Sequence, residues 1–120
     1  MRIIDRVYID GSFVEPHGRE PFDLFNPATA DTIGRVRLAD EEDARAAIAA
    51  AKRAFPAFSR TTKAERIAML HRMSDAVAAR RAAIIDATVE EYGAPIARAG
   101  WMADHAASTL VEAAKVLETY

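Results

Sequence analysis

The hydrophobic pattern divides the chain into a strand-rich part and a helix-rich part. In residues 1–38, short β-prone apolar runs are separated by Gly, Pro and Asn. In residues 39–120, apolar residues recur three and four positions apart, which is typical of helices packed on one face. We therefore predict an α+β fold, predominantly α. It should have an N-terminal β-hairpin and short strands followed by three or four helices.

The strand signals are local. Val7–Ile9 and Ser12–Val14 flank an Asp-Gly step, which is the strongest short-range signal for a hairpin. Residues 22–25 alternate apolar and polar, and residues 26–29 predict a turn because Pro fixes φ and Asn favours an Asx turn. Residues 32–38 alternate as a further strand, which places two arginines, Arg35 and Arg37, on a solvated face.

The helix signals are caps and apolar stripes. Asp40 can cap a first helix, and Pro56 is expected to end it. The apolar stripe of this helix comprises Ala44, Ala47, Ile48, Ala51, Ala54 and Phe55. Residues 62–65 form a capping box for the next helical region, and Gly93 is a good terminator for it. No Gly or Pro lies between, so residues 63–92 fit either one helix or two.

The last predicted helix, from about residue 96 to the end, carries two apolar stripes. One comprises Met102, Ala106, Thr109, Ala113, Val116 and Tyr120, and the other comprises Ala103, Ala107, Leu110, Ala114 and Leu117. Two stripes indicate a helix that is covered on more than one side. A chain of 120 residues has little with which to cover it. We therefore expect the fold to continue beyond this segment.

Composition sharpens the division and excludes several functions. Residues 1–38 contain two alanines, and residues 39–120 contain 25. The net charge of −2 argues against a general electrostatic grip on nucleic acid. The absence of cysteine excludes a disulfide framework, a thiolate metal site and a Cys nucleophile within this chain. No apolar run is long enough for a membrane span, and the charged start does not suit a signal peptide, so we expect a cytoplasmic protein.

The catalytic motifs that depend on glycine or histidine spacing are also missing. The five glycines lie at least seven residues apart, which excludes a dinucleotide loop, a P-loop and a nucleophile elbow. A triad of Asp104, His105 and Ser108 is disfavoured, because neighbouring helical side chains point about 100° apart. The residues alone therefore show no active site.

The order of the motifs does point to a family. A hairpin with an Ile-Asp-Gly step is followed by Asn-Pro-Ala-Thr at 26–29, Ala-Phe-Pro-Ala-Phe at 54–58, Ala-Glu-Arg at 64–66 and Glu-Tyr-Gly-Ala-Pro at 91–95. In this order and spacing, the chain resembles the N-terminal portion of the aldehyde dehydrogenase superfamily along essentially its whole length. It departs from that pattern at Ala30, Phe58 and Ala94, where relatives usually have Gly, Trp and Lys.

The resemblance implies an NAD(P)-dependent enzyme that oxidises aldehydes to carboxylic acids through a Cys nucleophile. Residues 1–38 and 39–120 would together form one incomplete N-terminal part of its cofactor-binding domain. The Cys, the Glu that activates water and the cofactor contacts would lie outside this segment. We therefore expect NAD or NADP in the full-length parent, and no cofactor, catalytic residue or activity in this chain alone.

Two sets of residues inherit possible roles from the resemblance. Relatives hold a monovalent cation through carbonyls before the Asn-Pro turn and a carboxylate in the Glu-x-Gly-x-Pro region, which here gives Leu24, Phe25 and Glu91. The helix after that motif lines the mouth of the substrate tunnel in relatives. By spacing, the candidates are Trp101, Met102, His105 and Ala106. The plainer alternatives are a solvated helical carboxylate and ordinary interior packing.

A second hypothesis is a stand-alone helical oligomerisation or protein-interaction module derived from that family. A reading frame that continues past Tyr120 would favour the enzyme, and a natural stop codon there would favour the module. The partners that we expect are the remainder of the enzyme chain, or a second copy bound through the last helix. The contact would be the stripe with Leu110, Ala114 and Leu117 or the Met102–Tyr120 face, with the edges of the hairpin at Val7–Ile9 as a further candidate.

Overall fold

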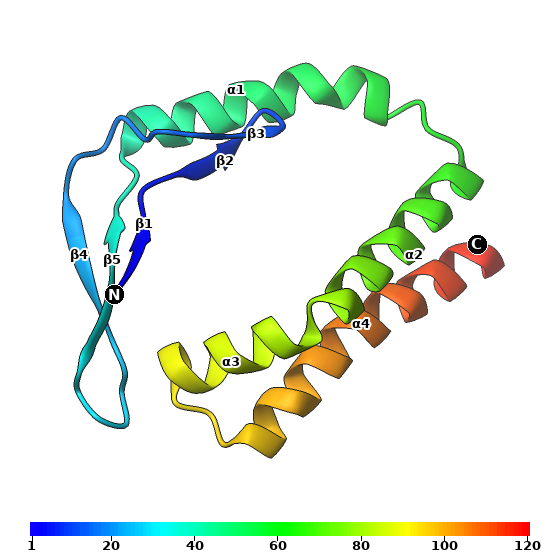
Figure 1. Ribbon diagram of the computed structural model, residues 1–120. Coiled ribbons are helices and arrows are strands. Elements are labelled where there is room, and N and C mark those ends of the chain that lie inside the picture. The colour runs from blue at the N-terminus through cyan, green and yellow to red at the C-terminus, as the bar shows by residue number, and fades with distance from the viewer. The chain divides into compact units, whose positions relative to one another are not determined.

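The computed structural model describes residues 1–120 and has five strands followed by four helices (Figure 1). It divides into two compact units, Met1–Arg60 and Thr61–Tyr120. The predicted class, α+β with a predominance of helix, is confirmed. The shift in composition at residue 38 falls inside the first unit, where the last strand gives way to the first helix.

The first unit contains a two-stranded hairpin and a separate three-stranded sheet. The hairpin pairs β2 (Val7–Ile9) with β3 (Ser12–Val14), as predicted. Its two turn residues, Asp10 and Gly11, have φ angles of 55° and 83°. This left-handed pair is what a tight two-residue hairpin turn requires, and it explains the Asp-Gly step.

The three-stranded sheet has the order β1-β5-β4, with β4 (Pro21–Phe25) antiparallel and β1 (Arg2–Ile4) parallel to β5 (Thr32–Arg37). The hydrophobic pattern predicted β4 and β5 but not β1. Gly34 of β5 explains how β1 can pack against β5. A Cβ at Gly34 would lie 2.8 Å from the carbonyl oxygen of Arg2, so only glycine admits this close approach.

Helix α1 (Glu41–Phe58) starts where its cap predicts but ends later than expected. Asp40 and Asp43 form a capping box at its N-terminus. The prediction that Pro56 ends the helix is wrong, because Pro56 lies in the last turn. There it removes few intrahelical bonds, and the Ser59 amide still donates to the Phe55 carbonyl at 2.8 Å.

The apolar stripe predicted for α1 is split between two environments. Ala47, Ala51 and Ala54 line a groove against the hairpin residues 8–11. Ile48 and Phe55 remain 59% and 66% exposed. The hairpin therefore covers only one edge of the stripe.

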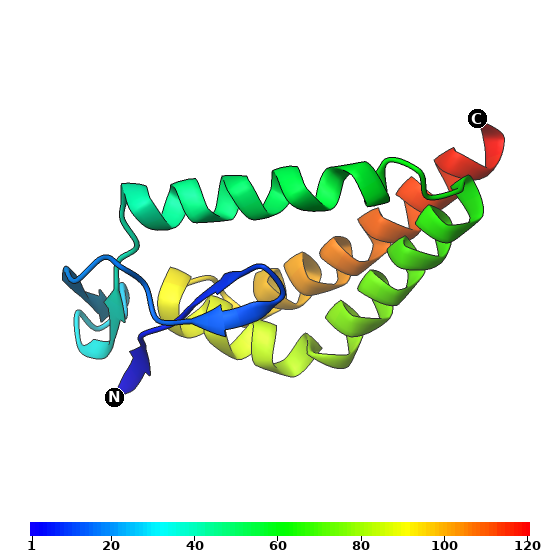
Figure 2. The same cartoon turned by 90° about the horizontal axis from the view of Figure 1, so that it is seen from above.

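The second unit consists of α2 (Lys63–Ala79), α3 (Arg81–Tyr92) and α4 (Ile96–Thr119). The capping box of Thr62 and Glu65 is confirmed, and so is Gly93 as a left-handed C-cap with φ of 74°. Residues 63–92 form two helices that break at Arg80. Helix α4 runs alongside α2 and α3 (Figures 1 and 2).

Only one of the two stripes on α4 packs inside the second unit. Ala103 and Ala114 are buried, and the Ser74 hydroxyl of α2 donates to the Ala107 carbonyl at 2.9 Å. In the stripe that includes Leu110, Ala114 and Leu117, Ala114 is fully buried and both leucines are half-buried. The Met102–Tyr120 face stays open, with Val116 and Tyr120 54% and 93% exposed. None of the four helices is both long and apolar enough to cross a membrane.

Candidate functional site

The tunnel-mouth candidates lie on the outer side of α4. Trp101 and His105 are one turn apart, and their rings stack with centroids 4.7 Å apart and planes 10° apart. The Arg98 guanidinium lies 4.3 Å from the centroid of the Trp101 ring. Arg98, Trp101 and His105 therefore form a ladder of planar groups, and Trp101 is half exposed.

The other two candidates lie further round the same helix and take no part in this ladder. Met102 is half-buried, and Ala106 is exposed. Both belong to the open stripe of α4. The structure thus brings Trp101 and His105 together and places Met102 and Ala106 beside them on one continuous surface.

Asp104 forms an ion pair with Arg81 of α3 and does not orient His105. Its carboxylate accepts hydrogen bonds from Nε and Nη2 of Arg81 at 2.6 and 2.9 Å. The Arg81 hydrogen bond holds the pKa of Asp104 below its usual range, so this carboxylate stays ionised. The pairing agrees with the geometric argument against a triad of Asp104 with His105.

An open groove runs between α3 and the first turns of α4, beside Trp101. Its residues are Arg81, Ile85, Ile96, Ala97, Gly100, Trp101 and Asp104. Gly100 keeps this part of the groove open, because a Cβ there would approach Nη2 of Arg81 to 3.3 Å. The surface has an aromatic edge, apolar walls and one ion pair. It offers no nucleophile.

The predicted cation residues are divided between the two units. Leu24 and Phe25 end β4, where the pairing with β5 shifts register between them. Glu91 lies half-buried in the last turn of α3. No group of three or more His, Cys, Asp or Glu side chains is arranged to hold a metal ion. The site formed by two carbonyls and Glu91 therefore stays a prediction.

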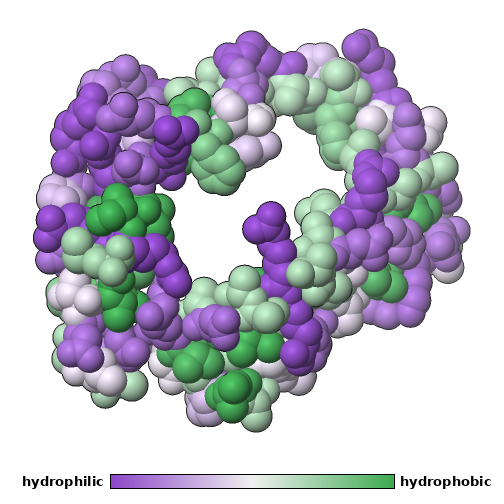
Figure 3. Space-filling view, in the orientation of Figure 1, coloured by the Kyte–Doolittle hydropathy of each residue, from purple (hydrophilic) through white to green (hydrophobic).

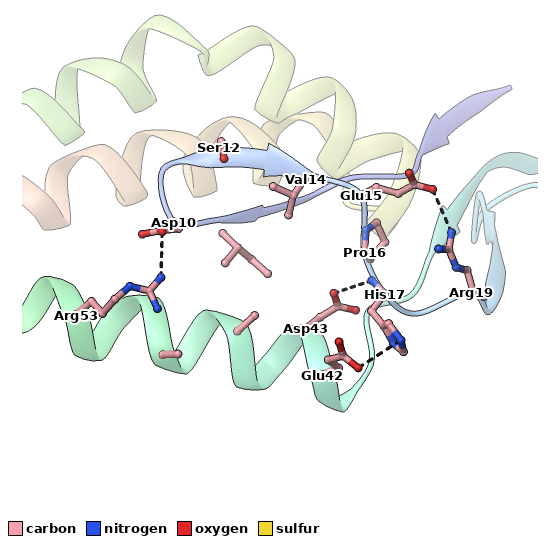
Figure 4. A pocket seen from close by; sticks show the side chains of 13 residues that line it. Asp10, Ser12, Val14, Glu15, Pro16, His17, Arg19, Glu42, Asp43 and Arg53 are labelled. Carbon is pink, nitrogen blue, oxygen red and sulfur yellow. Dashed lines mark hydrogen bonds and ion pairs between the residues drawn. The ribbon is translucent and has the colours of Figure 1, made fainter.

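The first unit contains a pocket that the sequence did not predict, between the hairpin, the segment 15–19 and α1 (Figure 4). At its base, the buried carboxylate of Asp43 accepts hydrogen bonds from the backbone amides of His17 at 2.8 Å and Gly18 at 3.1 Å. The Asp40 amide donates to the same carboxylate at 2.9 Å. These three amides lower the pKa of Asp43 to about 2.

Ion pairs frame both ends of this pocket (Figure 4). Arg53 of α1 donates to Asp10 of the hairpin turn at 3.0 Å. At the other end, Glu15 accepts hydrogen bonds from Arg19 and Arg37, which lower the pKa of Glu15. Every charged group named here is neutralised by a neighbour, so the pocket holds the hairpin on α1 and presents no unpaired catalytic group.

Sequence reasoning identified Asp40 as a cap but missed the second role of Asp43. An acidic residue three positions after an N-cap signals a capping box. Nothing local signals that the same carboxylate binds amides 25 and 26 residues earlier in the chain. The buried Pro16 and the crowded Gly18, both next to His17, are the features that could have drawn attention to this segment.

Comparison with known proteins identifies the family. The model of the aldehyde dehydrogenase family matches residues 13–120. The 3-succinoylsemialdehyde-pyridine dehydrogenase of a Pseudomonas species is 38% identical over 96 residues, which is 80% of this chain and 20% of that protein. The solved structure of lactaldehyde dehydrogenase from Escherichia coli covers the whole chain with a TM-score of 0.93 at 32% identity. This chain corresponds to 25% of that structure.

A further solved structure is the NAD-dependent benzaldehyde dehydrogenase from Corynebacterium glutamicum. It matches 95% of this chain at 25% identity with a TM-score of 0.88, and the match covers 25% of its own length. The chain therefore belongs to the aldehyde dehydrogenase family. It spans about a fifth of the length of the curated relatives that it matches.

Proposed function

We propose that this chain is the N-terminal part of an enzyme that oxidises an aldehyde to a carboxylic acid with NAD. The match of the family model over residues 13–120 carries the proposal. A similar solved structure is described as NAD-dependent, which favours NAD over NADP in the parent. A cytoplasmic location is part of the same proposal.

By this proposal the chain is inactive alone. The family reaction needs a thiolate nucleophile and a dinucleotide-binding segment, and the chain has no Cys and no closely spaced glycines. We expect no NADH when the purified chain is mixed with NAD and aldehydes. The aldehydes to test are a pyridyl semialdehyde, benzaldehyde and lactaldehyde, which appear in the names of proteins similar to this chain. Turnover that copurifies with the chain would contradict the proposal.

Within the parent, we propose that the Trp101–His105 side of α4 borders the substrate tunnel, and that Leu24, Phe25 and Glu91 have the cation-binding roles that the family resemblance implies. The exposed planar ladder supports the first role, since flat aromatic groups suit a carbon-rich substrate. The register shift at Leu24 and Phe25 supports the second, because irregular pairing leaves carbonyls available. Both roles come from the family resemblance.

The apolar surface left open by the two units supports a role for partners. Large apolar side chains remain exposed in both units, among them Phe22 in the first and Val116 in the second, each 54% exposed. Figure 3 shows apolar patches over the strands of the first unit and around α3 and the start of α4 in the second.

We propose that the remainder of the parent enzyme covers these faces, and that the isolated chain self-associates through the open face of α4. Sedimentation at micromolar concentration should show dimers or larger species. Val116→Glu, on the open stripe, should shift the chain toward monomer. Ser108→Glu, which adds the same charge at another exposed position of α4, is the matched control. A wild-type chain that sediments as a monomer would contradict self-association.

A further inference from the structure

The imidazole of His17 lies between two carboxylates at the N-terminus of α1. Its Nδ1 is 2.6 Å from Oδ2 of Asp40, and its Nε2 is 3.3 Å from Oε2 of Glu42. Figure 4 shows the His17 ring beside Glu42, at the edge of the pocket. A neutral imidazole carries one N–H, and an imidazolium carries two. Only the protonated ring can therefore donate to both carboxylates at once.

From this geometry we propose that His17 is a pH-sensitive latch, which fastens the segment 15–19 to the first turn of α1 when its ring is protonated. This segment joins the hairpin to β4, so the latch ties the end of the hairpin to the helix. The proposal does not depend on the dehydrogenase function. It uses only contacts within the first unit and involves no catalytic residue or cofactor.

The charges around the ring favour its protonated form. From α1 and its cap, Asp40, Glu41, Glu42 and Asp43 face this region, and the single cation there, Arg45, is already bridged to Glu41. From the neighbouring segment and β5, the charged groups are Glu15, Arg19 and Arg37, and Glu15 pairs with both arginines. The acidic groups therefore dominate, although the positive end of the helix dipole opposes them.

These surroundings fix the direction of the pH dependence. The Asp40 hydrogen bond, followed by the charges of Asp40 and Glu42, raises the pKa of His17 above its usual 6.5. The extra stability is therefore complete below pH 6.5 and is lost as the pH rises through the raised pKa. Asp43 provides a second attachment that does not change in this range, because its pKa of about 2 keeps it ionised. Deprotonation of His17 thus loosens the segment without releasing it.

The test follows the His17 ring by NMR as the pH is raised from about 5 to 9 in the whole chain. In the wild type, the titration midpoint of the His17 ring should lie above pH 6.5. Asp40→Asn keeps an oxygen that can cap the helix but removes the charge, and it should shift the midpoint downward. Glu42→Gln should shift it downward by less. Glu41→Gln is the matched control, since that carboxylate pairs with Arg45, and it should shift the midpoint least.

Thermal unfolding provides a readout of the latch itself. At about pH 5.5, the midpoint temperature of unfolding should be higher for the wild type than for His17→Gln. At about pH 8.5, this difference should be smaller. A His17 midpoint at or below 6.5, or one that does not move in Asp40→Asn, would overturn the proposal. So would a stability difference between wild type and His17→Gln that is the same at both pH values. If His17→Gln fails to fold, the Asp40→Asn titration decides the matter.

Discussion

Ala30 occupies a backbone conformation that favours glycine. Its φ is 62°, one of only two positive values at non-glycine residues in the chain. It closes the turn after β4, where its amide donates to the Asn26 carbonyl at 2.8 Å and the Asn26 amide donates to the Asp31 carbonyl at 2.9 Å. The family pattern has Gly at this position, and glycine adopts this left-handed conformation with less strain than alanine.

Replacing Ala30 with Gly should therefore stabilise the chain. Relief of the left-handed strain, less the extra entropy of glycine in the unfolded chain, gives an expected gain of about 0.5–1 kcal/mol in the free energy of unfolding. Urea denaturation measures it. The matched control is Ala28→Gly in the same turn, where φ is negative and the change should cost stability. Equal losses in the two variants would show that the Asn26–Asp31 turn is not strained at Ala30.

At the scale of the elements, residues that act on near neighbours were predictable. Asp10-Gly11 specified the hairpin, Thr62 with Glu65 began α2, and Gly93 ended α3. The strand β1 was not predictable from its three residues, because it forms only by pairing with β5 more than 30 positions away. The break at Arg80 also lacked a signal, since no Gly or Pro marks it.

Periodicity predicted both stripes of α4 but could not say which one is covered. The structure assigns the covered side to Ala114, which is fully buried, and leaves its neighbour Ala113 exposed. The small side chains of Ala99, Ala103 and Ala114 are what allow α4 to lie close to its neighbours. Sequence alone treats the two alanine-rich stripes as equivalent.

A pair of substitutions separates the two faces of α4. Ala114→Leu should lower the free energy of unfolding by about 1–3 kcal/mol, because the added side chain has no space in the buried contact. Ala113→Leu adds the same atoms on the open stripe and should change stability by less than about 0.5 kcal/mol. Thermal or urea unfolding measures both. A larger loss for Ala113→Leu than for Ala114→Leu would mean that the packed face is assigned to the wrong side.

For the molecule as a whole, the fold class was predictable from the sequence. The order of short motifs from Asn26 to Pro95 carries the family, and the family match over residues 13–120 confirms it. The roles of the candidate site residues stay predictions. The rings of Trp101 and His105 stack on α4, and Leu24 and Glu91 belong to different units. The contacts of Asp43 and His17 could not be predicted from local sequence, because they join distant parts of the chain.

We propose that residues 1–120 serve as the N-terminal part of an NAD-dependent aldehyde dehydrogenase. A chimera provides the test. In it, this chain replaces the matched quarter of E. coli lactaldehyde dehydrogenase, whose structure aligns with all of this chain. The measurement is NADH formation from lactaldehyde, compared with the host lacking that segment and with this chain alone. We predict turnover by the chimera and none by either control. A folded chimera no more active than the host without the segment, or turnover by this chain alone, would contradict the proposal.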